Sequence, residues 1–120
     1  MSGPALELAR ETHPTDAGEV AVLVVTGDLD LSNADDLGAA IAREPLRSGL
    51  VVDLAAVPFM DSSGLRVLML ASGEREGSFA TVVAPGSPVR RVLDLAGLAE
   101  RIPSFPDRTE AAGAAAAGGS

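Results

Sequence analysis

Short apolar runs separated by turn-forming residues divide the chain into segments. These runs predict strands at four places, residues 5–11, 19–27, 49–54 and 78–85. The first run alternates between apolar and polar residues and should be half exposed, whereas the other three barely alternate and should be buried on both faces. Pro, Asp and Gly come close together in residues 13–18, which predicts a turn and therefore a hairpin between the first two strands.

Between the strands, apolar residues recur at helical spacing. This spacing predicts helices over residues 32–43, 62–76 and 87–97. Ser32 is the expected N-cap of the first helix, and Pro45 ends that helix near Arg43. The third helix has the favourable start of a serine followed by a proline, and Gly97 ends it.

The C-terminal part of the chain carries weaker signals. Two prolines limit residues 100–106 to a short edge strand, and the capping pattern from Asp107 to Glu110 predicts a last short helix. Residues 113–120 are an Ala/Gly tail that we expect to be disordered, so the single predicted domain covers residues 1–112. The order of elements predicts an α/β fold with a mixed sheet of four to five strands and helices packed against it.

Composition narrows the range of partners and of compartments. The formal net charge is −8, and all nine basic residues are arginine, without a basic run that would suit a nucleic acid backbone. There is no cysteine, which fits a reducing cytoplasm. No apolar stretch approaches the roughly 20 residues that span a bilayer, and the N-terminus lacks the features of a signal peptide. We therefore expect a cytoplasmic protein without membrane insertion.

Few residues of the chain could carry out catalysis. His13 is the single histidine and lies in the predicted hairpin turn, so a Ser-His pair or a histidine metal cluster is not expected. The chain has no lysine and no glycine-rich phosphate loop. The sequence therefore predicts no enzyme activity, no metal and no cofactor.

Two carboxylates, Asp28 and Asp30, follow the second predicted strand. A magnesium site of the aspartate-based phosphatases would also need a lysine. A calcium loop starting at Asp28 fails at its sixth position, Asn33, and at its twelfth, Ala39. With both metal sites rejected, the segment is interpreted as a loop leading into a helix, with two exposed carboxylates available to a partner.

The segment Asp61-Ser62-Ser63-Gly64 joins a buried strand directly to an apolar helix. Asp and Ser are favoured N-caps, so helix capping alone accounts for the segment. Two adjacent hydroxyls exceed what one cap requires, and a serine at this point is accessible to a kinase. A phosphate there would add a charge of about −1.5 to −2 beside Asp61, which could switch an interface off.

The helix that follows has two distinct sides. Leu65, Leu68, Met69 and Ser72 share one face by their spacing, which predicts the buried side. Arg66 and Leu70 project on another side. Leu70 is either an exposed apolar anchor for a partner or packs under a neighbouring loop.

Four segments, in this order, resemble the STAS domain family and in particular its stand-alone members, the anti-sigma factor antagonists. They are VTGDLDLSNADDL, LVVDLAAVPFMDSSGLRVLM, APGSPVRRVLDLAGL and IPSFPDRTEAA. The resemblance implies a protein that, when unphosphorylated, binds an anti-sigma factor serine kinase and frees the sigma factor. The kinase then phosphorylates the antagonist, and a serine phosphatase resets it.

The resemblance also implies roles for single residues. The phosphorylated residue of the family directly follows the aspartate, which is Ser62 here, with Ser63 as the alternative. Asp28 replaces the usual glutamate of the family, and Arg66 replaces a glycine found in many members. The expected partner-binding residues are Asp28, Asp30, Asp61, Ser63, Gly64, Arg66 and Leu70.

The sequence is also compared with two other functions, each less well matched by its residues. The first is a STAS subunit of a lipid-transport ABC complex, in which phosphorylation plays no part. The second is a small hydrolase that uses Ser62 as its nucleophile, for which His13 is the only imidazole.

Overall fold

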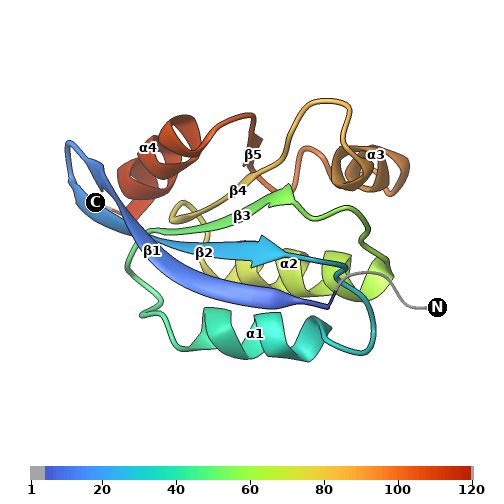
Figure 1. The fold of residues 1–120 in the computed structure, drawn as a ribbon. Coiled ribbons are helices and arrows are strands. Elements are labelled where there is room, and N and C mark those ends of the chain that lie inside the picture. The colour runs from blue at the N-terminus through green and yellow to red at the C-terminus, as the bar shows by residue number, and fades with distance from the viewer. Residues whose placement is uncertain (1–4, 120) are drawn as a thin grey trace.

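The computed structural model describes residues 5–119, and the side chains of residues 5–116. This part of the chain forms one five-stranded sheet in the order β1-β2-β3-β4-β5 (Figure 1). The strands are β1 (Glu7–Thr15), β2 (Gly18–Thr26), β3 (Leu50–Ala56), β4 (Phe79–Val82) and β5 (Ser104–Phe105). The helices are α1 (Ala34–Ala42), α2 (Ser62–Glu74), α3 (Pro88–Leu95) and α4 (Arg108–Gly119). β1 pairs antiparallel with β2 and the other pairs are parallel, which confirms the predicted α/β fold with a mixed sheet.

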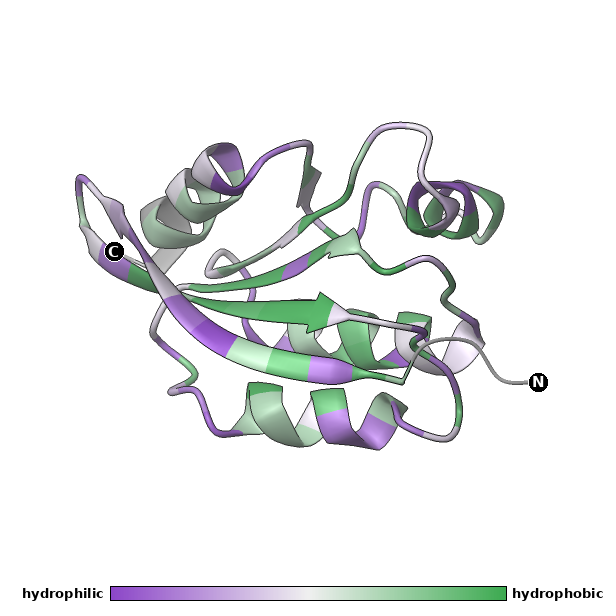
Figure 2. Cartoon of the chain, in the orientation of Figure 1, coloured by the Kyte–Doolittle hydropathy of each residue, from purple (hydrophilic) through white to green (hydrophobic). Residues whose placement is uncertain are grey.

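Helices cover both faces of the sheet. α1 and α2 lie on one face and α4 lies on the other (Figure 1). Because successive side chains of a strand point to opposite faces, Leu23 and Val52 join the cluster with α1 and α2, while Val22 and Val51 join the cluster with α4. Both faces of β2 and β3 are therefore covered by apolar side chains, which explains the hydrophobic run of β2 in Figure 2, whereas Asp53 interrupts the run of β3.

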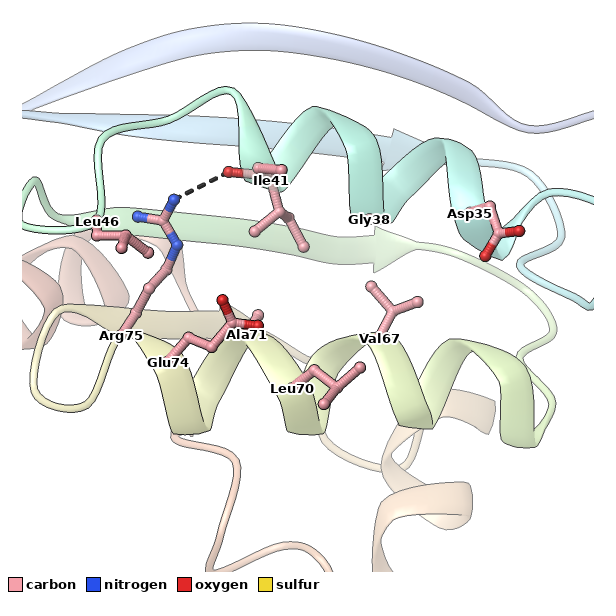
Figure 3. Close-up of a pocket in the computed structure, with 10 residues that line it drawn as sticks. Asp35, Gly38, Ile41, Leu46, Val67, Leu70, Ala71, Glu74 and Arg75 are labelled. Carbon is pink, nitrogen blue, oxygen red and sulfur yellow. Dashed lines mark hydrogen bonds between the residues drawn. The ribbon is translucent and has the colours of Figure 1, made fainter.

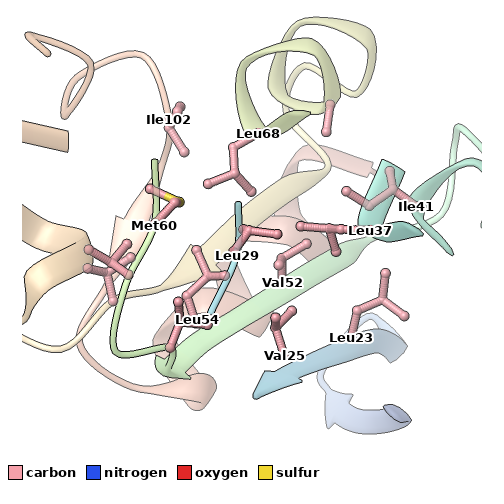
Figure 4. Close-up of a cluster of buried hydrophobic side chains, with 14 of the residues drawn as sticks. Leu23, Val25, Leu29, Leu37, Ile41, Val52, Leu54, Met60, Leu68 and Ile102 are labelled. Atoms are coloured by element: carbon pink, nitrogen blue, oxygen red, sulfur yellow. The ribbon is translucent and has the colours of Figure 1, made fainter. Parts of the chain in front are cut away.

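The larger cluster extends to the edge of the sheet where the strands end. Leu29, Met60 and Leu68 are at most 2% exposed and lie together in Figure 4. α3 adds Val89 and Leu93 to the same cluster. The start of α2 is therefore seated on packed side chains.

The hairpin differs from the prediction in its length. β1 continues to Thr15, so His13 lies in the strand opposite Val20 and not in the turn. The turn is tighter than expected because Gly18 adopts a φ of 112° and the Thr15 hydroxyl accepts a bond from the Ala17 N–H at 3.2 Å. Pro14 is tolerated in β1 because β1 is an edge strand.

The predicted N-cap of α1 was wrong by one residue. Asn33 is the N-cap, and the Ser32 hydroxyl instead donates to the Asp30 carboxylate at 2.6 Å. Asp35 and Asp36 do lie in the first turn of α1, where negative charge suits the helix dipole.

The buried face of α2 also differs from the prediction. Met69 is 39% exposed, whereas Ala71 is 5% exposed. The reason is that α2 packs against α1 as well as against the sheet, so its buried stripe turns toward Ala71. Leu65 and Leu68 are buried as predicted.

The C-terminal helix is longer than expected. α4 begins at Arg108, with the Asp107 carboxylate accepting from the Glu110 N–H at 2.9 Å as the capping pattern predicted. It continues through Gly119, across most of the segment that we expected to be disordered. Small residues allow this, because Ala115 is fully buried and approaches Gly49 closely. Ser120 lies outside the described residues, and the domain boundary after Ala112 stays a prediction.

Candidate functional site

The loop after β2 and the loop after β3 lie side by side. β2 and β3 are parallel neighbours, so their carboxyl ends meet at the same edge of the sheet. Leu29 and Met60 form an isolated parallel bridge there. The Leu29 N–H donates to the Phe59 carbonyl at 2.9 Å, and the Asp61 N–H donates to the Leu29 carbonyl at 3.2 Å. These bonds bring the Asp28–Asp30 segment and the start of α2 into one site.

Asp61 connects the two loops through its side chain. One carboxylate oxygen accepts from the Ser63 N–H at 2.8 Å, which makes Asp61 the N-cap of α2. The other oxygen accepts from the Leu31 N–H at 3.3 Å. Asp61 therefore has a structural role and at the same time holds a negative charge beside Ser62.

Asp30 shapes the opposite loop. Its carboxylate accepts from both the N–H and the hydroxyl of Ser32, at 3.0 and 2.6 Å. The Asn33 amide group donates to the Asp28 carbonyl at 2.9 Å and accepts from the Asp30 N–H at 3.0 Å. Asp28 and Asp30 are both half-buried, so neither is as exposed as the sequence suggested.

The two serines differ in accessibility. Ser62 is the first residue of α2 and is exposed, while Ser63 is half-buried. Ser63 takes part in the cap through its backbone N–H, which donates to the Asp61 carboxylate. Neither hydroxyl is hydrogen-bonded to any residue in the range 5–119, so the hydroxyl of Ser62 in particular is available for chemistry.

Gly64 is required at its position by packing. A Cβ atom there would lie 2.7 Å from Met60 Cγ and 2.9 Å from Leu29 Cγ and Cδ2. These distances are shorter than any comfortable carbon contact. The absent side chain lets α2 start directly on the Leu29–Met60 bridge, which sets the position of Ser62.

The two paired loops also carry exposed apolar side chains. Leu31 is 81% exposed and Phe59 is 49% exposed, although each lies in one of the two paired loops. The sequence interpretation missed both residues. An apolar residue isolated between polar loop residues was the signal that could have identified Leu31.

α2 extends this surface along its exposed side. Arg66 is exposed and Leu70 is 56% exposed, which excludes the alternative that Leu70 packs under a loop. Positions four apart on a helix lie on one side, so Ser62, Arg66 and Leu70 form a continuous strip.

The histidine lies at the far end of the sheet. His13 is opposite Val20, and about 20 Å of strand separates Val20 from Thr26, where β2 ends near the site. Ser62 therefore has no imidazole nearby. Within residues 5–119, no group of His, Cys, Asp and Glu residues is arranged to hold a metal ion. No helix in the same range is both long and apolar enough to cross a membrane.

Comparison with known proteins identifies the family. The STAS domain family matches residues 12–111. The anti-sigma-F factor antagonist RsfB of Mycobacterium tuberculosis is 40% identical over 89 residues, which cover 69% of this chain and 70% of RsfB. A crystal structure of an anti-sigma factor antagonist from Mycobacterium paratuberculosis superposes with a TM-score of 0.75 at 32% identity, covering 92% of this chain and 95% of that one. A putative antagonist from Thermotoga maritima gives 0.69 at 25% identity over 85% and 90% of the two chains. The chain therefore belongs to the STAS domain family.

Proposed function

We propose that this protein is an anti-sigma factor antagonist that acts by binding and not by catalysis. In its unphosphorylated form it binds an anti-sigma factor serine kinase in the cytoplasm and frees the sigma factor. The observation that carries the proposal is the exposed Ser62 at the start of α2, next to two paired loops that expose the apolar residues Leu31 and Phe59. The likeness to RsfB, an anti-sigma-F factor antagonist by name, supports it.

Ser62 is the residue that the kinase phosphorylates in this proposal, and Ser63 is the alternative. Exposure favours Ser62, because the kinase must place the γ-phosphate of ATP directly against the serine hydroxyl. Ser63 is half-buried, and its N–H is bound to the Asp61 carboxylate. A serine phosphatase reverses the modification.

In this proposal, phosphorylation breaks the complex because the phosphate adds negative charge to the binding surface. A phosphate at Ser62 carries about −1.5 to −2 charges and sits beside Asp61, whose carboxylate is held in place by two backbone N–H groups. Burying that charge against an apolar partner surface near Leu31 and Phe59 is costly. The N-terminus of α2 stabilises the phosphate locally, so the fold persists while the interface is lost.

The partner-binding surface in this proposal consists of the strip on α2 and the two loops. The predicted residues Asp28, Asp30, Asp61, Ser63, Gly64, Arg66 and Leu70 belong to it, and Leu31 and Phe59 are added. Asp61 and Gly64 contribute by positioning the loops, whereas Arg66 and Leu70 present their side chains to the partner.

The test uses purified anti-sigma factors of the kinase class from the source organism, examined one by one with ATP. We expect one phosphoryl group on the antagonist, located on Ser62 by peptide mapping. Ser62→Ala should abolish labelling, and Ser63→Ala should retain it. Persistent labelling of Ser62→Ala at Ser63 would move the site to the neighbouring residue.

A binding assay separates charge from shape. Ser62→Asp should weaken binding to the anti-sigma factor, whereas Ser62→Asn, of the same size and neutral, should bind nearly as well as the parent. Equal affinities for the two variants would contradict the charge mechanism. Specific binding to the ATPase subunit of a lipid transporter, with no anti-sigma factor bound, would instead assign the chain to that assembly.

A further inference from the structure

A groove of about 360 Å³ runs between α1 and α2 (Figure 3). It begins near Val67, little more than one helical turn from Ser62, and ends at the turn that follows α1. Its apolar lining consists of Gly38, Ile41, Ala42, Leu46, Val67, Leu70 and Ala71. Leu46 and Leu70 are 58% and 56% exposed, so the walls of the groove present apolar surface that the fold leaves uncovered.

Arg75 holds the far end of the groove in place. Its side chain is 2% exposed, and the guanidinium donates to the carbonyl oxygens of Ile41 at 2.9 Å, of Pro45 at 2.8 Å, and of Glu44. These carbonyls belong to the last turn of α1 and to the two residues after its C-cap, where a positive charge is favourable. The spacing of the two helices and the position of Leu46 are therefore preformed.

The remaining charges along the groove are negative. Arg75 donates to the carbonyl groups, and burial lowers its pKa from the ordinary value, which its attraction to Glu44 and, less strongly, to Glu74 opposes. Asp35 at the Val67 end and Glu74 at the Leu46 end are both exposed, and neither pairs with a cation among the described residues. Arg66 does not line the groove. An occupant that complements this surface is apolar in the middle and basic at its ends.

We propose that the groove docks a basic segment of the anti-sigma factor, whose aliphatic side chains enter between Leu46 and Leu70 and whose Lys or Arg side chains face Asp35 and Glu74. This inference rests on the proposed function, because the groove continues from the surface around Ser62 along the same helix. A partner seated on Ser62 reaches Val67 without leaving α2. The groove thus adds a second contact that phosphorylation does not touch.

Leu46 gives the sharpest test, because it lies at the end of the groove opposite to Val67 (Figure 3). We expect Leu46→Ser to weaken binding of the purified anti-sigma factor about tenfold, as loss of an apolar anchor does. Leu95→Ser is the matched control, since Leu95 is 81% exposed on α3 and outside the groove. Binding is measured by titration calorimetry at a fixed salt concentration.

Filling the groove is an independent test. A Cβ atom on Gly38 would lie 3.9 Å from Val67, an ordinary contact, so Gly38→Leu should fold and project into the groove. Gly73→Leu adds the same side chain on α2, where nothing lies within 4 Å of the new Cβ. We expect loss of binding for Gly38→Leu alone, with both variants keeping a cooperative thermal transition.

The charges are tested through association rates. The double variant Asp35→Asn with Glu74→Gln should lower the association rate several-fold at low salt and flatten its salt dependence. Asp36→Asn is the control, because Asp36 occupies the same helical turn without lining the groove.

The outcomes of these experiments distinguish a failure of the groove proposal from a failure of the proposed function. Parent-like affinity for Leu46→Ser and Gly38→Leu, while Ser62→Asp still releases the partner, overturns the groove and leaves the proposed function standing. Absence of binding to every anti-sigma factor of the class by the parent protein overturns both. In the complex, NMR cross-saturation from the unlabelled anti-sigma factor should reach the methyl groups of Leu46, Val67 and Leu70.

Discussion

Gly64→Ala is expected to destabilise the protein by overpacking at the start of α2. The new methyl group would lie 2.7 Å from Met60 Cγ and 2.9 Å from two carbon atoms of Leu29. Met60 and Leu29 are 2% and 0% exposed within a packed cluster, so they cannot move aside freely. Overpacking of this kind costs about 1–3 kcal/mol.

The helix propensity of alanine offsets part of this cost, so a matched variant is needed. Gly73→Ala lies in the same helix, and its Cβ would meet nothing within 4 Å. It should gain about 0.5–1 kcal/mol from propensity alone. The difference between the two variants therefore isolates the clash, and Gly64→Ala should be about 1–3 kcal/mol less stable than Gly73→Ala.

Urea unfolding followed by circular dichroism at 222 nm measures this difference. The chain has no Trp and no Tyr, so intrinsic fluorescence offers a poor probe. If Gly64→Ala proved as stable as Gly73→Ala, the start of α2 would have room to move, and the argument that Gly64 positions Ser62 would be refuted. On the proposed function, a second consequence is slower phosphorylation at Ser62 in Gly64→Ala, measured below the unfolding transition.

Three further variants test other contacts. Asp61→Ala removes the acceptor for the Ser63 and Leu31 N–H groups, so the free energy of unfolding should fall by about 1–2 kcal/mol, with Asp61→Asn intermediate. Equal urea midpoints for these two variants and the parent would contradict the capping role. Arg75→Met leaves buried carbonyl oxygens of Ile41, Glu44 and Pro45 without their donor and should cost about 2 kcal/mol or more, whereas Arg66→Met on the exposed side should cost little. The pKa of Glu110 is raised by its hydrogen bond and by its repulsion with Asp107, so the folded state holds the proton more tightly than the unfolded state. The stability that protonated Glu110 adds to the folded state is fully present below the pKa of Glu110 in the unfolded chain, and it is lost as pH rises through the pKa in the folded state. Glu110→Gln should therefore be more stable than the parent at pH 7 and no more stable near pH 3 in thermal unfolding, and a gain independent of pH would contradict this assignment.

Local pattern was sufficient for the order of elements. Strands buried on both faces appear as unbroken apolar runs, and helix starts carry their own polar caps, so each is visible within a few neighbouring residues. The Ser87 cap of α3 and the Asp107 cap of α4 were found in this way. The family resemblance and the candidate residues Ser62 and Asp61 likewise came from one contiguous segment.

Local pattern also led to errors where a neighbour distant in sequence decides the outcome. Met69 has the apolar character of a core residue, but contact with α1 turns the buried stripe of α2 toward Ala71. The low complexity of the Ala/Gly segment after Ala112 predicts disorder, yet small residues fit closely against Gly49 and extend α4.

What the sequence by itself determined is the list of elements, the family and the serine at the start of α2. Only the tertiary structure decided what surrounds that serine. The parallel pairing of β2 with β3 brings the Leu31 N–H to the Asp61 carboxylate across thirty residues of chain, and it leaves the side chains of Leu31 and Phe59 exposed. Arg75 likewise finds the carbonyl groups of α1 only after the two helices pack. Periodicity records which residues are apolar, whereas a contact depends on which segments the fold places together.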